Sequence, residues 1–551
     1  MGLVQTLASL QGWRRWLSAF VLGILFTLSF APFYFTPLIA VSISGALFMI
    51  DGILDRADQK TRLQTAKSAA LFGWFFGFGF FLVSLHWLAL AFFVQAELFA
   101  WMAPFAVIGM GAFLACFHAA AFGFVGAMAT YLSGPPWRRL VFFSVAFMGM
   151  EYTRGHILTG LPWNLPGQAL AGLAAGAQSA AWIGVYGLSL IVILIGSLPA
   201  LLTRGTADAS AQTTLSLAKG IVACVLATFT LLAIGVVRLA TTPLNERDDV
   251  IVRIVQPNIP QREKIDPGFF VRNVQKTLAL SSDPIANADT VYVVWPENAA
   301  PRINEYADAL DAIDASLPTN AYLIAGAVRK ADNPNSGSVF YNAIAIAAPS
   351  ATGPDGSNQQ TTTKRQFVDF YDKHHLIPFG EYLPLRSVLS ALGLAQLAPY
   401  AEGFAKGSGP RTLHIGPASF APSICYESIF PGRLYPKKDR PEWLAVVTND
   451  AWYGNTSGPR QHLDQARLRS IETGLPMARA ANTGISVMIG PAGRYVARKP
   501  LYESGVIDAP LPQALPETFY SKFGDFTFLA LCACLLLILH LNRGPQSIKA
   551  A

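Results

Sequence analysis

The sequence has 551 residues, of which 52% are hydrophobic and only 14% are charged. Its mean hydropathy of +0.38 excludes an ordinary soluble globular protein of this size. The formal net charge of +7 does not indicate a nucleic-acid partner, because many basic residues flank apolar segments and no basic-aromatic tract is present.

Eight apolar segments approach the roughly 20 residues that a membrane-spanning helix needs. They occupy residues 16–35, 36–54, 68–92, 98–132, 138–155, 177–202, 217–240 and 524–541. The first seven predict a helical membrane bundle over residues 1–242, and the last predicts a transmembrane helix and tail within 516–551. Segment 98–132 is long enough to be tilted or broken, and the spans show no cluster of buried charges that would mark an ion path.

Arg14 and Arg15 precede the first apolar segment, as basic residues precede a signal peptide. This segment is about twenty residues long and leads directly into a second span, so it is interpreted as a retained anchor. A twin-arginine signal is the less favoured alternative to basic residues that simply flank a first span.

Lysine and arginine are distributed unevenly among the short loops. They occur before residue 16, in loops 55–67, 133–139 and 203–219, and in the C-terminal tail, whereas loops 93–97 and 156–176 contain none. This bias predicts that both termini are cytoplasmic. Residues 243–515 then lie on the opposite face, which in a bacterium is the periplasm.

Residues 243–515 have the pattern of one α/β domain. Strands are predicted at 250–256, 290–296, 321–328, 341–348, 419–427, 443–450 and 484–491, and helices at 268–280, 303–316 and 461–480. Several strands lack polar alternation, as expected when both faces of a sheet are covered. Segment 351–363 is a polar low-complexity loop, and no internal repeat is present.

Cys425 is the only cysteine of this domain, since Cys116, Cys224, Cys532 and Cys534 lie in apolar segments. It therefore has no partner for an intradomain disulfide. A zinc site is not expected, because it needs three or four ligands and His374, His375 and His462 form no known ligand spacing with it. Two interpretations stay open, a buried core residue and a nucleophile. A helix starting after Cys425 would favour its thiolate form.

Three other segments carry charged residues at or after a predicted strand end. "VVWPENAA" contains Glu297, "FYDKHHLIPFGEYLP" contains Lys373 and Glu381, and "VTNDAWYG" closes strand 443–450. Open α/β sheets bind ligands at the carboxyl ends of their strands. A glutamate, a lysine and a cysteine are suited to act as a base, an oxyanion-stabilising cation and a nucleophile.

The motifs "WPEN", "YDKHHLIPFGEYLP", "ICYES" and "NDAWYG", in this order, resemble the carbon-nitrogen hydrolase, or nitrilase, superfamily. Seven spans before the domain and one after it narrow the resemblance to the bacterial apolipoprotein N-acyltransferases. The resemblance implies a polytopic α-helical membrane bundle that carries an α/β nitrilase-like domain with an αββα sandwich.

The resemblance also implies a reaction and a site. An acyl chain passes from a phospholipid to the α-amine of a diacylglyceryl-cysteine apolipoprotein, through a cysteine thioester and without a cofactor or metal, in a monomer. Glu297 is the general base, Lys373 stabilises the oxyanion and Cys425 is the nucleophile. Glu381 is a second essential glutamate, and Tyr426 and Glu427 shape the pocket. Plain aromatic packing of Tyr426 and a surface or capping role of Glu427 are the alternatives.

Four features leave alternatives open. "QPNIPQ" replaces the "QGNIPQ" of the family, and Ile265 stands where a tryptophan is expected. Trp163 is interpreted either as an acyl-chain contact or as an interfacial anchor. His374 and His375 are expected to be structural neighbours of the site rather than acid-base groups. The loop 382–410, with Leu394 and Leu397, is either a lid that dips into the membrane or a packed surface helix.

Two other functions are compatible with the sequence. A membrane-tethered amidase or nitrilase acting on a small substrate would have the same catalytic residues, but seven preceding spans exceed what a tether requires. A transporter with an inactive nitrilase-like domain is disfavoured because Glu297, Lys373 and Cys425 are all present.

Overall fold

The computed structural model describes residues 3–57, 60–132, 135–201, 210–285, 288–301, 303–305, 307–333, 337–349, 365–384 and 403–542. The chain divides into two compact units. The bundle unit comprises Met1–Thr242, Thr456–Leu468 and Phe519–Ala551, and the sheet unit comprises Pro243–Asn455 and Arg469–Thr518. The segment Thr456–Leu468, which lies inside the expected α/β domain, therefore groups with the bundle residues.

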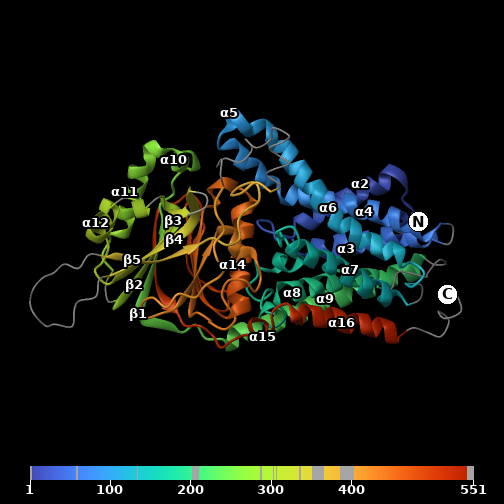
Figure 1. Cartoon of the computed structure of the whole chain (residues 1–551). Coiled ribbons are helices and arrows are strands. Elements are labelled where there is room, and N and C mark those ends of the chain that lie inside the picture. The colour runs from blue at the N-terminus through green and yellow to red at the C-terminus, as the bar shows by residue number, and fades with distance from the viewer. Residues whose placement is uncertain are drawn as a thin grey trace, which may run out of the picture. The chain divides into compact units, whose positions relative to one another are not determined.

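The bundle unit is helical (Figure 1). Its helices are α1 (Leu3–Ser9), α2 (Gly12–Thr27), α3 (Pro37–Leu54), α4 (Arg62–Ser84), α5 (Ala96–Phe99), α6 (Ala103–Ala127), α7 (Pro136–His156), α8 (Ala180–Ser197), α9 (Ser210–Thr241), α15 (Phe519–Phe523) and α16 (Phe526–Leu541). Short 3-10 helices occur at η2 (His86–Phe93), η3 (Ala100–Met102), η4 (Pro166–Leu170) and η5 (Leu198–Ala200).

Five helical segments among the described residues are long and apolar enough to cross a membrane. They are Pro37–Leu54, Arg62–Ser84, Ala96–Ala127, Ala180–Ala200 and Leu215–Thr241, and Phe526–Leu541 is a shorter apolar helix. Each of the eight predicted apolar segments overlaps a helix, but α2 and α16 have only 16 residues each and α7 is not one of the five. The long segment 98–132 is indeed interrupted, because α5 and η3 precede α6.

Buried charged groups occur within these helices. In α6 and α7, the buried His118 Nε2 lies 3.0 Å from Glu151 Oε1, and Glu151 also pairs with Arg154. The buried Arg139 pairs with Asp51 of α3. These groups are partnered within the protein, which is the condition under which ionisable groups are tolerated at membrane depth. The sequence interpretation missed them because it treated Arg139 as a loop residue and Arg154 as the end of a span.

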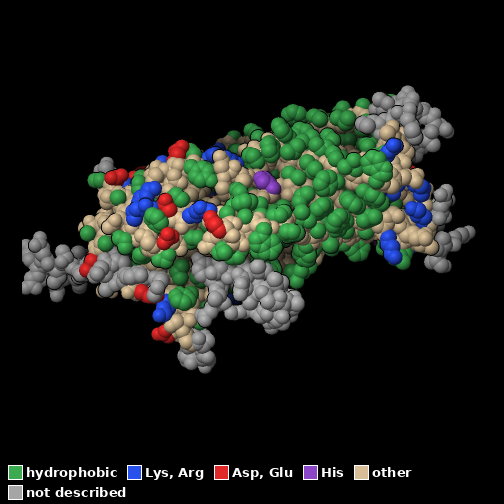
Figure 2. All heavy atoms as spheres, turned by 90° about the horizontal axis from the view of Figure 1, so that it is seen from above, with side chains coloured by type: hydrophobic (Ala, Val, Ile, Leu, Met, Phe, Trp, Pro, Cys, Tyr) green, Lys and Arg blue, Asp and Glu red, His purple; other side chains and the backbone are tan. Residues whose placement is uncertain are grey.

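Apolar side chains cover the outer surface of the bundle unit. Figure 2 shows a continuous hydrophobic surface over this unit, with Lys and Arg side chains gathered at one end of it. Large exposed apolar residues of α9 include Ile221, Val222, Val225, Leu226, Phe229, Ile234, Val236 and Val237. A soluble protein rarely exposes such a patch, so this surface is suited to lipid.

The sheet unit contains two β-sheets. The six-stranded sheet has the order β11-β1-β2-β3-β4-β5 and the five-stranded sheet the order β10-β9-β8-β7-β6. The first consists of β1 (Glu246–Gln256), β2 (Thr290–Pro301), β3 (Ala321–Asn333), β4 (Gly337–Ala348), β5 (Gln366–Asp372) and β11 (Gly505–Pro512). The second consists of β6 (Phe420–Ile424), β7 (Trp443–Thr448), β8 (Met477–Ala481), β9 (Ser486–Ile489) and β10 (Tyr495–Lys499).

One buried core joins the two sheets. It contains Val252 and Tyr292 from the first sheet and Phe420, Trp443 and Met488 from the second. A second core lies on the other face of the six-stranded sheet, where the helices α11 (Phe270–Ser281) and α12 (Ala307–Ser316) pack (Figure 1). Because both faces of β1, β2 and β3 are buried, these strands are nearly continuous apolar runs, as their sequences indicated.

The predicted strands are present, but the sequence interpretation missed β5, β8, β10 and β11. The predicted helix 461–480 is wrong at its end, because α14 (Ser457–Thr473) stops before Gly474, which has a φ of +68°, and β8 follows. Segment 351–363 and, within the predicted lid, Leu394 and Leu397 lie outside the described residues.

Candidate active site

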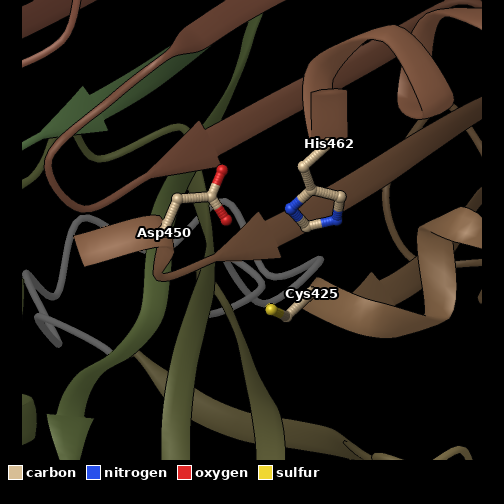
Figure 3. Close-up of side chains that lie close together, drawn as sticks. All are labelled: Cys425, Asp450 and His462. Atoms are coloured by element: carbon tan, nitrogen blue, oxygen red, sulfur yellow. The ribbon is translucent and has the colours of Figure 1, made fainter. Parts of the chain in front are cut away.

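The predicted site residues follow strands that run in the same direction. β1, β2 and β3 are parallel to one another, and so are β6, β7 and β8. β4 is antiparallel to both β3 and β5, so β5 runs in the same direction as β3. Glu297 lies in the last part of β2, Lys373 directly follows β5, and Cys425 directly follows β6. Figure 3 shows Cys425 at the end of its strand and Asp450 beyond the end of β7. These side chains therefore meet at the carboxyl ends of the strands.

Lys373 is fully buried between two carboxylates. Its Nζ donates to Glu381 Oε1 at 2.8 Å and lies 3.7 Å from Glu297 Oε1. Asn342 joins both carboxylates, since its Nδ2 donates to Glu297 Oε1 and to Glu381 Oε1 at 2.7 Å each. The backbone N–H of Ile377 donates to Glu381 Oε2 at 2.8 Å. Burial lowers the pKa of Lys373, but Glu381, Glu297 and Cys425 outweigh it and raise the pKa overall, so the side chain is an ammonium.

Cys425 has a strained backbone at a sharp turn. Its φ is +50°, in the left-handed region that residues other than glycine rarely adopt. It begins the 3-10 helix η9 (Cys425–Ile429), and Ser428 Oγ donates to its carbonyl oxygen at 2.8 Å. Just before it, the N–H of Ile424 donates to Glu427 Oε2 at 2.8 Å. These bonds hold the turn that directs the thiol from the strand end.

The thiol of Cys425 is protonated in the resting protein. Burial and the carboxylate of Glu297 raise its pKa, Lys373 lowers it, and the net direction is upward. The expected thiolate stabilisation by a following helix is therefore wrong. The helix that follows is a single 3-10 turn of five residues, which provides little aligned dipole, and the site is buried. A thiol in this state needs a base to react, and Glu297 is close enough to shift its pKa.

Glu427 is a buried carboxylate, not a surface charge. Its Oε1 accepts from the backbone N–H groups of His374 and His375 at 2.8 and 3.2 Å. Its Oε2 accepts from the Tyr371 hydroxyl at 2.9 Å and from the N–H of Ile424. Burial raises the pKa of Glu427, but the hydrogen bond and charge of His374 outweigh it, and the pKa is lowered. Glu427 thus joins the loop after Lys373 to the strand before Cys425.

Tyr426 and the two histidines pack beside this carboxylate. His374 Nδ1 lies 2.7 Å from Glu427 Oε1. The His375 ring stacks on Phe430 with a centroid distance of 3.8 Å and contacts the Tyr426 ring at 5.6 Å. Tyr426 itself is buried. Both histidines and Tyr426 therefore lie in aromatic and carboxylate contacts at the edge of the site.

Trp163 and Ile265 lie in different units. In the bundle unit, Trp163 is only 2% exposed, its ring contacts Trp87 at a centroid distance of 4.8 Å, and its Nε1 donates to Gln461 Oε1 at 2.8 Å. This burial does not fit an interfacial anchor. In the sheet unit, Ile265 ends the short helix α10 (Gln261–Ile265) and is partly buried.

The sequence interpretation missed three residues of the site. Asn342 lies inside a strand, and the only sequence signal for it as a site residue is a polar amide within a run rich in alanine and isoleucine. Asp450 accepts from Thr448 Oγ1 at 2.9 Å and from Arg479 Nη2 at 2.6 Å, and all three are buried. "VTNDAWYG" was predicted as a site segment, but Asp450 was not singled out. Lys264 donates to the backbone carbonyl of Glu297 at 2.6 Å, and no signal in the sequence separated it from a surface lysine.

The sheet unit and its site define the class of protein. A model of the carbon-nitrogen hydrolase family matches residues 251–518. The residues at the strand ends, a buried cysteine beside a glutamate and a lysine, are those that such a domain was expected to contain. The chain therefore combines a carbon-nitrogen hydrolase domain with a set of membrane helices.

The comparison of the whole chain is more specific. A model of the apolipoprotein N-acyltransferase N-terminal domain matches residues 22–198. A Rhodopseudomonas palustris protein named apolipoprotein N-acyltransferase is 37% identical over 544 residues, covering 97% of this chain and 96% of that protein. Proteins of the same name from Bradyrhizobium diazoefficiens and Caulobacter vibrioides are each 37% identical, covering 96% and 93% of this chain and 95% and 92% of theirs. The chain belongs to the apolipoprotein N-acyltransferase family.

Proposed function

We propose that this protein transfers an acyl chain from a phospholipid to the α-amine of the diacylglyceryl-cysteine at the N-terminus of an apolipoprotein. The observation that carries the proposal is the buried grouping of Cys425, Glu297 and Lys373 in a chain whose relatives along nearly its whole length are named apolipoprotein N-acyltransferases. A tethered amidase for small substrates is disfavoured by the same relatives.

In the first half-reaction, the Cys425 sulfur attacks the ester carbonyl of the phospholipid. Glu297 accepts the thiol proton, and the negative oxygen of the tetrahedral intermediate forms beside the Lys373 ammonium. The ester C–O bond then breaks, and Glu297 returns the proton to the departing lysophospholipid oxygen. An acyl thioester is left on Cys425.

In the second half-reaction, the lipoprotein amine attacks the thioester. Lys373 stabilises the new oxyanion, Glu297 accepts a proton from the amine, and the C–S bond breaks. Glu297 passes this proton to the departing sulfur, which restores the thiol and the carboxylate, and the amide product leaves. An apolar site favours the amine over water as the acceptor.

We further propose eight membrane spans, formed by α2, α3, α4, α6, α7, α8, α9 and α16, with both termini in the cytoplasm. The sheet unit is then an αββα sandwich in the periplasm, and the protein is a monomer in the inner membrane. Extracting a sixteen-carbon chain into water costs roughly 12 kcal/mol, at about 0.8 kcal/mol per CH₂. A domain fixed at the membrane avoids this cost.

Mass spectrometry of the purified full chain mixed with phospholipid tests the function. The expected result is a mass gain of one acyl chain, mapped to Cys425, that disappears when a diacylglyceryl-cysteine peptide is added and reappears as an amide on that peptide. Release of free fatty acid without peptide acylation would favour the amidase-like hydrolase instead. The Cys425→Ala variant is the control for non-specific acylation.

A further inference from the structure

A short segment after β1 joins the two sheets at the carboxyl ends of their strands. Asn482, directly after β8, donates from Nδ2 to the carbonyl of Ile259 at 2.9 Å, and the N–H of Ile259 donates to Asn482 Oδ1 at 3.2 Å. Asn449, directly after β7, donates from Nδ2 to Gln261 Oε1 at 2.8 Å. The start of α10 is thereby fixed to the five-stranded sheet.

The other end of α10 contacts the six-stranded sheet through Lys264. Its Nζ donates to the backbone carbonyl of Glu297 at 2.6 Å. Next to this carbonyl, β2 leaves its regular register with β3 between Trp295 and Ala300. The backbone at Glu297 is therefore not fixed by strand pairing alone, and Lys264 supplies a hydrogen bond at this irregular point.

Lys264 also brings charge to the site. Burial lowers its pKa to about 8, and both Glu297 and Cys425 lie close enough to raise it in part. Its hydrogen bond is to a neutral carbonyl, so that bond does not neutralise the ammonium. Lys373, in contrast, donates directly to the carboxylate of Glu381 at 2.8 Å.

We propose that Lys264 is a positioning residue for the reaction, which fixes the backbone of Glu297 and adds a second positive charge beside Glu297 and Cys425. The inference rests on the proposed role of Glu297 as the base. When the proton leaves the thiol, negative charge moves to sulfur, and a nearby cation stabilises that charge. The charge of Lys373 is partly neutralised by Glu381. Lys264 therefore supplies additional positive charge when the thiol loses its proton.

Alkylation of Cys425 by iodoacetamide tests this directly, because it depends on the thiolate and needs no lipid substrate. The full chain in detergent is treated between pH 6 and 10, and modification of Cys425 is quantified by peptide mass spectrometry. Besides Lys264, the charged groups that act on this thiol include Glu297, Lys373 and Asp450, and these are the same in every variant compared.

Three substitutions separate charge from hydrogen bonding. Lys264→Gln keeps an N–H donor without the charge, Lys264→Met removes both, and Lys264→Arg keeps the charge. We expect Lys264→Gln and Lys264→Met to slow alkylation at pH 7, where Lys264 is still mostly charged, by about tenfold, the equivalent of one pKa unit. Lys264→Arg should remain within about threefold of wild type. Lys276→Met is the matched control, since exposed Lys276 also donates to a backbone carbonyl, that of Asn258 at 3.4 Å.

Two outcomes are decisive. If Lys264→Gln and Lys264→Arg both fold and alkylate at the wild-type rate across the pH range, Lys264 does not influence the thiol and the proposal is overturned. If the alkylation rates of the Lys264 variants differ from that of wild type as expected, but neither wild type nor any variant forms an acyl-enzyme, the positioning role of Lys264 stands. The proposed acyl transfer is then wrong.

Discussion

Lys373 Nζ lies 2.8 Å from Glu381 Oε1 but 3.7 Å from Glu297 Oε1, so Glu381 is the direct counterion of the buried ammonium. The two glutamates therefore differ in their contact with the ammonium, although Asn342 donates to both. Glu381 also accepts a backbone N–H and is held in place. Glu297, in contrast, is held by the neutral amide of Asn342 and by a more distant cation.

The first prediction concerns this ion pair. Glu381→Gln should leave Lys373 buried without its direct counterion, and breaking such a pair costs about 3–5 kcal/mol. We expect a clearly lower melting temperature and acyl-enzyme formation slowed on the order of 100-fold, the size of effect seen when an oxyanion-stabilising group is displaced. Thermal unfolding and the rate of Cys425 acylation measure the two effects.

Glu442→Gln is the matched control. Glu442 pairs with Arg247 at 3.2 Å, but its side chain is half exposed, so its loss should change stability by only about 0–1 kcal/mol. Equal effects of the two substitutions would contradict the assignment of Glu381 as the counterion of Lys373.

The second prediction concerns a close backbone approach behind Glu297. A Cβ atom on Gly326 of β3 would lie 2.3 Å from the carbonyl oxygen of Pro296 and 2.5 Å from the Cα of Glu297. Gly326→Ala must therefore displace this backbone, at a typical cost of about 1–3 kcal/mol. We expect acylation of Cys425 to slow at least about tenfold, because a small displacement of a catalytic group strongly lowers the reaction rate.

Gly109→Ala in α6 is the comparison, because no atom lies within 4 Å of the added Cβ there. It should leave acylation unchanged. Wild-type acylation in a folded Gly326→Ala variant would show that the position of Glu297 tolerates the shift.

Sequence patterns predicted the apolar strands well, because a strand that is buried on both faces has a continuous run of apolar residues in its sequence. β8 was missed for a physical reason. Its sequence "MARAA" is rich in alanine and has a helical preference, and only tertiary packing between β7 and β9 makes it a strand. Arg479 within β8 gave a polar signal that does not fit an inner strand, yet it is buried by its pairing with Asp450.

In the candidate site, too, some residues could be predicted from the sequence and others depend on tertiary packing. Glu297, Lys373 and Cys425 follow strands in the sequence and carry recognisable motifs, so they were predicted. Asn342 and Lys264 were not, because their roles arise from which strands are neighbours. Asn342 lies on β4, and its contact with both glutamates depends on the pairing of β4 with β3 and β5. A linear pattern contains no information on that pairing.

The third prediction concerns stability in acid. The pKa of Glu427 is lowered from its usual value of 4.5, so the folded protein binds this proton less readily than the unfolded chain does. The stabilisation is present above pH 4.5 and is lost as the pH falls through the lowered pKa. The melting temperature of wild type should therefore fall between about pH 5 and pH 3, by the same linkage.

Glu427→Gln should be less stable than wild type at pH 7, by about 1–3 kcal/mol for each buried partner left unsatisfied. Its melting temperature should depend less on pH in the acid range, because the titrating carboxyl is gone. Parallel pH profiles of the two proteins, measured by differential scanning fluorimetry, would contradict this assignment of the acid-sensitive group.

The fourth prediction tests the proposed orientation. The Lys and Arg bias of the loops motivates a periplasmic Cys425. A membrane-impermeant maleimide should label Cys425 in intact spheroplasts, at a slow rate because the thiol is 4% exposed. Peptide mapping distinguishes it from the other four cysteines. Labelling that requires prior permeabilisation of the inner membrane would reverse the topology.

The last prediction concerns the order of the chemistry. A single thiol with a nearby base implies two half-reactions and a covalent intermediate, so wild type given phospholipid alone should release lysophospholipid in one stoichiometric burst. A hydroxylamine-sensitive acyl adduct should accumulate at the same time. Cys425→Ala should abolish both. Cys425→Ser should be nearly as inactive, because Glu297 is too weak a base for a hydroxyl of much higher pKa than a thiol. If lysophospholipid forms only when the lipoprotein acceptor is present and no adduct is trapped, the acyl chain passes directly between the two lipids in a ternary complex, and Cys425 is not acylated.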